Sequence, residues 1–544
     1  MKRTSTLAVT TALLASSAPL GLLTVGAGTA HAAGRTYFVS PGGNDGNPGT
    51  SAGAPFRTIQ KAADSARPGD TVSIMNGTYS ERSKGSNVLT VTRSGRPGAP
   101  ITFTAHPGHN PVIHPVKAWN GISVYGASYI AIKNLEIKGN NAALTLAGAE
   151  RDSDKSDPTY NTNCLTVERD RATGAVSHHV EVSGNKVHHC AGGGISAISS
   201  DHVDITSNHV YSNGWYTVYG TSGISILTPR DVGAADPRTY KIRITGNRVH
   251  DNETKVKWER CRCYSDGNGI IIDTLKGDAG KPAYRGRTLV ADNLSYDNGG
   301  SGIHSYKSQH VDIVHNTAYK NGRSTRMKSY ANIFAHDSTD VRLLNNIAYG
   351  RPGQATNSKS RNVDVTYDYN VYFGGKAPEV KGPNDIVADP KFADPGTGAE
   401  AGFRLGKGSP AIGSATPFAA VTTGLAEARR AGGAPDRGAF SFTTEGDDAA
   451  PEASEPSAES ASPTPRSTTA AEPSGESDAG TSPAAEAPVG TDDDADSGLK
   501  PNGASEPLAE TGGSDPTLPL GIAAAVLGIG GGLLFAARRK RSRH

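Results

Sequence analysis

Residues 311–321 read VDIVHNTAYKN, and this pattern of alternating apolar residues, an Asn and a second apolar pair decides the fold. Neighbouring copies lie as close as 23 residues apart, which is the period of a solenoid repeat. Period-two alternation indicates short strands, because successive side chains of a strand point to opposite faces. The repeat predicts stacked coils that bury their apolar sides against one another. The recurring Asn occupies positions Asn185, Asn208, Asn247, Asn293, Asn316 and Asn346.

The recurring Asn is interpreted as structural. Asn tolerates left-handed backbone angles, and its amide can bond to copies in the coils above and below. A second phrase of the form Gly-Ile-x-Ile, or a close variant, precedes the later copies of the repeat. Its alignment predicts one inward-facing column made of Ile195, Ile224, Ile270, Ile303 and Ile333.

Both ends of the chain carry targeting signals. Residues 1–32 have Lys2 and Arg3, an apolar stretch and the triplet Ala30-His31-Ala32, which is typical of a secretory signal peptide. At the other end, residues 508–512 (LAETG) precede an apolar segment, 518–537, and a basic tail, 538–544. The apolar segment is long enough to span a bilayer, and a basic tail stays cytoplasmic.

This C-terminal order resembles the sortase sorting signal of Gram-positive surface proteins, in an LAxTG form. The resemblance implies cleavage between Thr511 and Gly512 and covalent attachment of Thr511 to peptidoglycan, so sortase and peptidoglycan are expected partners. The protein would then contact the membrane only through its C-terminal segment, before sorting. The alternative is a single-pass membrane anchor.

Residues 445–507 are rich in Ala, Ser, Pro, Glu and Asp and predict a disordered, wall-spanning linker. This linker is strongly acidic, whereas the whole chain has a net charge of only +2, so residues 33–444 are basic. A basic extracellular domain suits an acidic polymer, although a solvated face beside an anionic wall explains it equally well. A polysaccharide, and not a nucleic acid, is the expected partner.

The domain begins with PFRTIQKAADSARPGD, in which Phe56, Ile59, Ala62 and Ala63 have helical spacing. A helix here would cover the open end of the solenoid. This passage, together with YFVSPGGNDGNPG before it and GFRLGKGSPAIGSA near residue 410, resembles the pectate-lyase-like superfamily. The resemblance implies an all-β, right-handed, single-stranded parallel β-helix over residues 33–444. The superfamily includes polysaccharide lyases, hydrolases, epimerases and glycan-binding proteins.

The resemblance also implies that substrate lies on the outer face of the strand formed by the Gly-Ile-x-Ile phrase. Adjacent coils lie about 4.8 Å apart, so Asp273, Tyr306 and His336 are expected to stack in one outward column. His304 and Lys307 would lie beside this column. These five residues are the candidate catalytic group.

The group contains what a uronate lyase needs. His304, Tyr306 or Lys307 could remove the C5 proton, Lys307 could neutralise the substrate carboxylate, and Tyr306 or His336 could protonate the leaving oxygen. The phrase GSGIHSYK resembles one in family-9 pectate lyases and places His304 where their catalytic Lys stands. Their calcium motif is echoed faintly by Asp266 and Asp273. The sequence therefore predicts a lyase, with Ca²⁺ as the one candidate cofactor.

Several alternatives remain open at this point. The column could be a polar, solvated turn ladder, and the protein a non-catalytic glycan-binding adhesin. A C5-epimerase shares the proton abstraction. A hydrolase would need two carboxylates, such as Asp273 with Asp266 or Asp337.

Two insertions flank the same region and contain residues suited to stacking on sugars or pairing with carboxylates. Ordinary exposed loops explain these insertions as well. The candidate substrate-binding residues are Trp258, Tyr264, Tyr284, Arg285 and Arg287.

The four cysteines, Cys164, Cys190, Cys261 and Cys263, can form disulfides in an exported protein, with pairing unassigned. Cys164 aligns with the inward Ile column, which would also fit a buried free thiol. A metal site from the Cys261-x-Cys263 pair with His188 and His189 lacks half of a zinc pattern.

Overall fold

The structure is a computed structural model that describes residues 34–152, 157–278, 280–327, 330–422, 424–425 and 434–442. The predicted signal peptide (1–32), linker (445–507), sorting motif with Thr511 and Gly512 (508–512), apolar segment (518–537) and basic tail (538–544) lie outside the described residues. In the part that is described, no helix is long and apolar enough to cross a membrane.

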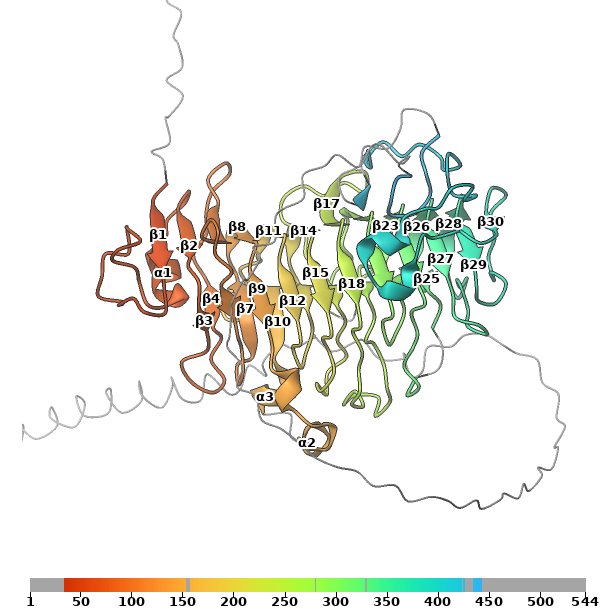
Figure 1. The fold of residues 1–544 in the computed structure, drawn as a ribbon. Helices are drawn as coiled ribbons and strands as arrows, with labels where there is room; N and C mark the ends of the chain where they lie inside the picture. The colour runs from red at the N-terminus through yellow and green to blue at the C-terminus, as the bar shows by residue number, and fades with distance from the viewer. Residues whose placement is uncertain are drawn as a thin grey trace, which may run out of the picture.

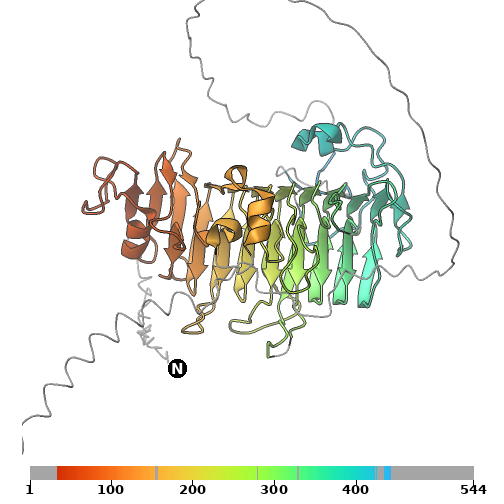
Figure 2. The same cartoon turned by 90° about the horizontal axis from the view of Figure 1, so that it is seen from below.

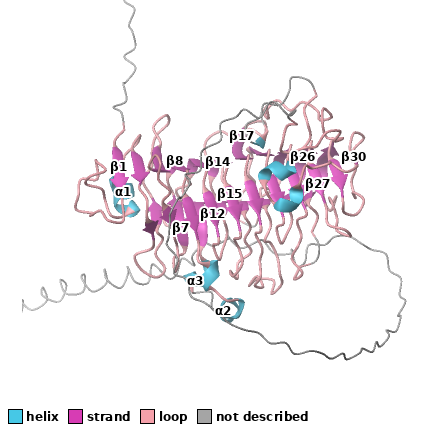
Figure 3. Ribbon diagram, viewed as in Figure 1, coloured by secondary structure: helices cyan, strands magenta, loops and turns pink. Residues whose placement is uncertain are grey.

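Three parallel sheets run the length of the molecule and form a solenoid (Figure 1). Each complete coil contributes one strand to each sheet in turn, as β22, β23 and β24 do. We call the sheets 1, 2 and 3 in the order in which such a coil visits them. Figure 3 shows that strands dominate and that helices are few and short.

Sheet 1 has eight strands, which are β4 (Leu89–Val91), β7 (Asn120–Tyr125), β10 (Asn163–Glu168), β13 (Ile195–Ile198), β16 (Ile224–Leu227), β19 (Ile270–Asp273), β22 (Ile303–Tyr306) and β25 (Ile333–His336). Sheet 2 has eleven, which are β1 (Thr36–Val39), β2 (Thr71–Ile74), β5 (Ile101–Ala105), β8 (Ser128–Lys133), β11 (His178–Ser183), β14 (Asp201–Thr206), β17 (Tyr240–Thr245), β20 (Arg287–Ala291), β23 (Gln309–Val314), β26 (Thr339–Leu344) and β28 (Val363–Asp368). Sheet 3 has eleven, which are β3 (Thr78–Tyr79), β6 (Val112–Ile113), β9 (Glu136–Lys138), β12 (Lys186–His188), β15 (His209–Tyr211), β18 (Arg248–His250), β21 (Leu294–Tyr296), β24 (Thr317–Tyr319), β27 (Ile347–Tyr349), β29 (Val371–Phe373) and β30 (Ile386–Val387).

The predicted inward column is confirmed by the strand register. Ile195 pairs with Ile224, Ile224 with Ile270, Ile270 with Ile303, and Ile303 with Ile333. All five side chains are at most 1% exposed. Burying such a column removes a continuous strip of apolar surface from water, which is the main favourable contribution to a solenoid's stability.

The recurring Asn residues form a hydrogen-bonded ladder at the turn between sheets 2 and 3. The Nδ2 of Asn293 donates to Oδ1 of Asn316 at 2.9 Å, and the backbone N–H of Asn293 donates to the same oxygen at 3.0 Å. One expectation was wrong, because the left-handed residue is the one before each Asn: His315, before Asn316, has φ 54°. The Asn therefore acts through its hydrogen bonds and not through its backbone angles.

A second Asn ladder, which the sequence reasoning missed, runs along the turn between sheets 3 and 1. The Nδ2 of Asn252 donates to Oδ1 of Asn298 at 2.9 Å, and that of Asn298 to Asn321 at 2.8 Å. The signal is visible in the repeat, since a second Asn follows the first by five residues in several copies. The two ladders fix two corners of the coils in which they occur and hold the short strands of sheet 3 in register between them.

The N-terminal end of the solenoid is covered by helix α1 (Ile59–Ser65), as the helical spacing predicts. The Thr58 side chain accepts a hydrogen bond from the Lys61 N–H and caps the helix. Ile59, Ala62 and Ala63 are buried, and α1 contacts β4, the terminal strand of sheet 1. The other two helices, α2 (Leu146–Arg151) and α3 (Pro158–Asn161), lie in the loop between β9 and β10.

The described part of the chain after β30 folds back over the outside of sheets 2 and 3. Figures 1 and 2 show it lying beside the strands and not extending the coil. Phe403, Leu425 and Phe440 pack there against Leu294 and Tyr296 of β21. Val421 packs against Leu289 and Ala291 of β20, so the segment covers parts of sheets 2 and 3 and leaves the outer face of sheet 1 to other uses.

Candidate functional site

The predicted outward column exists on sheet 1. Asp273 of β19 pairs with Tyr306 of β22, which pairs with His336 of β25. Ile270 and Ile272 on the same strand belong to the core, so Asp273 points to the other face. The Tyr306 and His336 rings stack with centroids 5.5 Å apart. His304 lies in the neighbouring outward column, paired with Ile271 and Phe334.

The Asp273 carboxyl is 3% exposed, and its pKa lies well above the usual range of an aspartate. Burial, with the nearby Asp266 charge, raises the pKa of Asp273 to about 8, against the pull of a hydrogen bond from the Thr274 hydroxyl. At neutral pH this carboxyl is therefore mostly protonated and can act as a proton donor. Burial also raises the pKa of Asp266 to about 6.

The Asp266 and Asp273 pair does not fit calcium. Ca²⁺ takes six to eight oxygen ligands. Among the described residues, no group of three or more His, Cys, Asp or Glu side chains could hold a metal ion. We therefore derive no step through calcium.

The Ser301 hydroxyl and the Asn268 side-chain amide together set the tautomer of His304. Asn268 Oδ1 accepts from the Ser301 N–H at 2.9 Å and from the Ser301 hydroxyl at 3.0 Å. Ser301 Oγ lies 2.5 Å from His304 Nδ1. Because the hydroxyl proton points to Asn268, Nδ1 must donate to Ser301, so we assign the lone pair to Nε2.

His304 is neutral in this site. Burial, with a further contribution from the His336 charge, lowers its pKa to about 3. The Phe334 ring stacks on the imidazole at 4.7 Å and restricts its rotation. An anionic substrate group nearby would raise this pKa, because a negative charge favours the imidazolium form.

Cationic groups surround the column. The Arg361 Nη2 donates to His336 Nε2 at 3.0 Å, and Lys307 Nζ lies 5.5 Å from the centre of the Tyr306 ring. Burial lowers the pKa of His336 to about 4, so this ring is neutral and its Nε2 lone pair is used by Arg361. Burial and the Asp273 charge raise the pKa of Tyr306. Arg361 follows sheet 1 in the loop before β28 and was not anticipated from the sequence.

Four of the five predicted substrate-binding residues lie in two loops at opposite ends of β19, and Arg287 is the first residue of β20. Trp258 and Tyr264 belong to the loop that leads into β19, and Trp258 is 3% exposed. The other three belong to the loop that leads into β20 or to β20 itself. The structure thus brings both insertions next to β19 but does not gather these side chains into one surface.

Two of them have structural partners that the sequence did not indicate. Tyr284 is 1% exposed and donates to Asp201 at 2.7 Å. Arg287 pairs with Asp312 at 3.0 Å on sheet 2. As placed, neither side chain offers a free face to a sugar, while Arg285 pairs at the surface with Asp231.

The cysteines form two disulfides, Cys164–Cys190 and Cys261–Cys263, and no described cysteine is free. The alignment of Cys164 with the Ile column was wrong, because Leu165 pairs with Ile195. The idea of a metal site with His188 and His189 also fails, since both cysteines of the Cys-x-Cys pair are consumed by their own bond.

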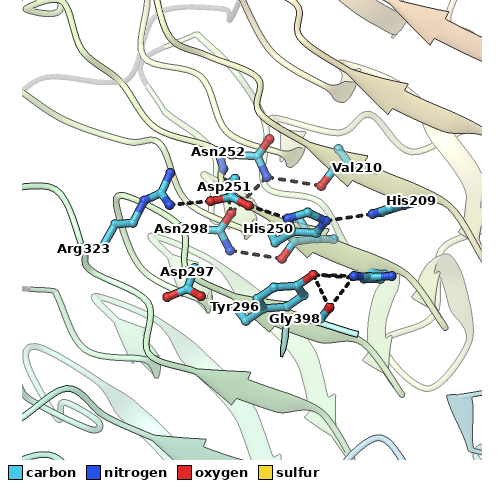
Figure 4. A network of polar contacts seen from close by, with 12 residues as sticks. His209, Val210, His250, Asp251, Asn252, Tyr296, Asp297, Asn298, Arg323 and Gly398 are labelled. Carbon is cyan, nitrogen blue, oxygen red and sulfur yellow. Dashed lines mark hydrogen bonds and ion pairs between the residues drawn. The ribbon is translucent and has the colours of Figure 1, made fainter. Parts of the chain in front are cut away.

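A second polar cluster lies on the outer face of sheet 3 (Figure 4). His209 and His250 are joined through their Nε2 atoms at 2.7 Å, and His250 Nδ1 lies 2.7 Å from Asp251 Oδ2. Tyr296 donates to the carbonyl of Gly398 at 3.0 Å, and burial lowers the pKa of His209 to about 3. This network fastens the C-terminal segment to sheet 3 and is filled by its own partners.

The large open cavity of the molecule lies elsewhere on sheet 1. It has a volume of about 1700 Å³ and is lined by the outward residues Ser123, Tyr125 and Glu168, together with loops at the N-terminal end. The strand register connects it to the catalytic candidates, since Glu168 pairs with Ile198, Ile198 with Leu227, and Leu227 with Asp273. Sequence reasoning did not find this cavity.

Two family models match the chain. Residues 120–366 match the right-handed β-helix region, and residues 37–193 match the Pel9A-like right-handed β-helix region. The fold is therefore a right-handed parallel β-helix. The match to the Pel9A-like region covers residues 37–193 of this helix.

The chain is also similar to individual proteins. A stretch of 92 residues is 42% identical to the uncharacterized protein YwoF of Bacillus subtilis (strain 168). The matched stretch makes up 17% of this chain and 17% of YwoF. Pectate lyase Pel9A is 15% identical over 76% of this chain and 97% of that one, with a TM-score of 0.44. An alginate lyase from Paenibacillus sp. str. FPU-7 is 15% identical over 60% of this chain and 96% of that one, with a TM-score of 0.35.

Proposed function

We propose that the β-helix cleaves an acidic, uronate-containing polysaccharide by β-elimination on the outer face of β19, β22 and β25. One observation carries the proposal: a neutral His304, with its Nε2 lone pair set by Ser301, lies one coil from a protonated Asp273. β-Elimination needs one group that takes a proton and another that gives one. Neutral His304 and protonated Asp273 have these opposite capacities at neutral pH.

The two groups are separated by about 7 Å along the strand and about 5 Å across to the next coil. This spacing leaves room for a sugar ring between them. His304 Nε2 removes the C5 proton, the C5–H electrons form the C4=C5 bond, and the C4–O bond breaks. The leaving oxygen takes the proton of Asp273, and solvent returns the proton from His304 to Asp273.

The positive charges have a defined use in this reaction. Removing the C5 proton puts negative charge on the uronate carboxylate, and nearby cations stabilise that charge. Lys307 and Arg361 stand at the column for this purpose. Tyr306, whose phenol stays protonated because its pKa is raised, can donate a hydrogen bond to the same carboxylate or to the leaving oxygen.

The second candidate is a C5-epimerase. It shares the abstraction by His304, but Asp273 would return a proton to C5 from the opposite face and leave the glycosidic bond intact. A protonated Asp273 supports epimerisation at C5 as well as it supports cleavage by β-elimination. Detection of an unsaturated product separates the two activities.

We further propose that the exported protein is anchored to peptidoglycan through Thr511, with residues 445–507 as the wall-spanning linker. The order LAETG, apolar segment and basic tail supports this. Mass spectrometry of wall fragments released by a muramidase tests it. A peptide ending at Thr511 and carrying a peptidoglycan stem is expected, and intact residues 508–544 in the membrane fraction would contradict anchoring.

The test of the activity is a screen of the full-length chain against acidic polysaccharides, reading the ultraviolet absorbance of the C4=C5 product. A rise on at least one uronate polymer is expected. No new reducing ends and no change in uronate configuration on any of them would leave the glycan-binding adhesin as the better account.

A further inference from the structure

The open cavity at the N-terminal end of sheet 1 is built differently from the catalytic column. Its floor is formed by the outward faces of β4, β7 and β10, and its walls come from the loops around α1, the β3–β4 connection and the start of α3. Its volume of about 1700 Å³ is large enough for several sugar units. Lining residues that matter below are Arg57, Arg82, Lys84, Trp119, Tyr125 and Arg171.

Three carboxylates of the cavity accept from backbone N–H groups, while the fourth, Glu168 on the floor, pairs with Arg171 at 3.5 Å. Glu81 accepts from the N–H groups of Val116 at 3.0 Å and Lys117 at 2.6 Å. Asp45 accepts from Arg57 and Thr58, and Asp170 accepts from the turn that follows it. Hydrogen bonding holds the pKa of Asp45 and Asp170 below the usual range, although burial opposes this at Asp45. These acids therefore serve to shape the loops.

Two of the basic side chains make ion pairs that are exposed to solvent, and Arg82 also donates to the Thr58 hydroxyl at 2.9 Å. Arg82 is 65% exposed and pairs with Asp45 at 3.0 Å, and Lys84 is 57% exposed and pairs with Asp157 at 3.2 Å. Exposed pairs of this kind contribute little to stability and exchange readily for another anion. Arg82 and Lys84 can thus turn to a ligand at little structural cost, whereas carboxylates that hold the backbone of the loops cannot.

Two aromatic rings complete the cavity. Trp119 lies half-buried at the base of β7, and the Tyr125 hydroxyl accepts a hydrogen bond from the Arg171 N–H at 2.8 Å, which fixes its position. Aromatic rings combine apolar contact area with a polar edge, which suits the faces and hydroxyl groups of sugars. Rings together with mobile cations match a sugar that carries carboxylates.

We propose that this cavity is a remote binding site for an acidic oligosaccharide and holds the same glycan chain on which Asp273 and His304 act. The identity of the glycan rests on the proposed function. The position of the cavity relative to the catalytic column does not depend on the proposed function. Glu168 on the cavity floor and Asp273 belong to one column of paired residues and are three strand spacings apart, which is about 14 Å. A polymer lying along the sheet would contact both places.

The test compares binding of uronic-acid oligosaccharides of graded length by calorimetry to the full-length wild type and to the double variant Arg82→Gln/Lys84→Gln. The matched control is Arg238→Gln, an 88% exposed Arg that also pairs with a neighbouring Asp. The double variant should weaken binding of long oligosaccharides about tenfold and reduce its salt dependence, because two charge-assisted contacts are lost. The control and the shortest oligosaccharides should be unaffected.

Turnover separates this inference from the proposed function. With long substrates the double variant should raise KM and leave kcat unchanged, and His304→Ala should keep wild-type affinity while losing product formation. Equal affinity of the double variant and the wild type, or no binding of any uronic-acid oligosaccharide, would overturn the inference. Tight binding lost in the double variant without product in the wild type would leave the inference standing and remove the lyase.

Discussion

Asp273 and Tyr306 lie directly opposite each other on the adjacent parallel strands β19 and β22, although 33 residues of chain separate them. Burial raises the pKa of both groups; the Asp273 charge adds to the rise at Tyr306, and the nearby Asp266 charge adds to the rise at Asp273. The pair therefore offers two protons to the same outer face. A solvated turn ladder would show neither burial nor shifted pKa values.

The activity should depend on the protonation of Asp273. Because the pKa of this carboxyl is raised to about 8, kcat/KM should be level below that pH and fall tenfold per pH unit above it. Asp273→Asn should lower kcat by two to four orders of magnitude, roughly the contribution of a general acid. A flat profile up to pH 10 in the wild type would show that another group supplies the proton.

The Asp273 carboxyl should also make the stability of the folded protein depend on pH. Folding raises its pKa from 3.8 to about 8, so the folded state binds the proton more tightly. The associated stability is fully present below pH 3.8 and is lost as the pH rises through about 8. Thermal unfolding should therefore show Asp273→Asn gaining on the wild type between pH 4 and 8. A constant difference across this range would contradict the buried, protonated carboxyl.

Ser301 should act as a positioning residue through His304. Ser301→Ala removes the partner of Nδ1 and lets the imidazole adopt either tautomer, so kcat should fall about tenfold or more while KM changes little. Nitrogen NMR of the histidine ring should show the Nδ1–H form in the wild type and a mixture in Ser301→Ala. Ser301→Thr, which keeps the hydroxyl, serves as the control. A wild-type ring protonated on Nε2 would refute the assigned tautomer.

The Asn ladder should be a major source of stability. Asn293→Ala removes the amide that donates to Asn316 and to the carbonyl of Ile244, and it leaves the N–H of Asn247 without its acceptor. Unsatisfied buried groups of this kind should lower the free energy of unfolding by about 3 kcal/mol. Chemical denaturation measures this, with the exposed Asn110→Ala expected to change little. If both substitutions lowered the free energy of unfolding equally, the Asn ladder would not be a major source of stability.

The two disulfides should contribute unequally to the free energy of unfolding. Cys164–Cys190 closes a sequence separation of 26 residues and is fully buried, whereas Cys261–Cys263 spans only 2. Replacing the first pair by Ala should cost about 3 kcal/mol, and replacing the second pair much less, because longer loops lose more entropy on closure. Denaturation of the two double variants side by side decides this. The reverse order would contradict it.

The fold and the outward column could be predicted because the repeat records both. Strand register is set by the buried Ile column, and that column appears in the sequence as the recurring Gly-Ile-x-Ile phrase or a close variant of it. Once Ile270 and Ile303 are aligned, Asp273 and Tyr306 follow by counting.

The rest of the site depends on turns whose lengths vary from coil to coil. Arg361 lies in the loop before β28, where no period fixes its position. Asn268 and Ser301 both stand two residues before the column Ile of their strands, but the repeat does not indicate that Ser301 bonds to His304. The partners of Tyr284 and Arg287 are on sheet 2, far away in the sequence, so their burial could not be read from the insertion itself. The cavity is formed by segments from residue 41 to residue 172 and has no local signature.

The most direct test of the account is the ultraviolet absorbance assay with the full-length wild type and His304→Ala on the same uronate polysaccharide, with His114→Ala as a matched control. The account predicts unsaturated product from the wild type and from His114→Ala, and a loss of at least about a hundredfold in His304→Ala with retained folding. Equal rates of product formation in the wild type and His304→Ala would contradict it.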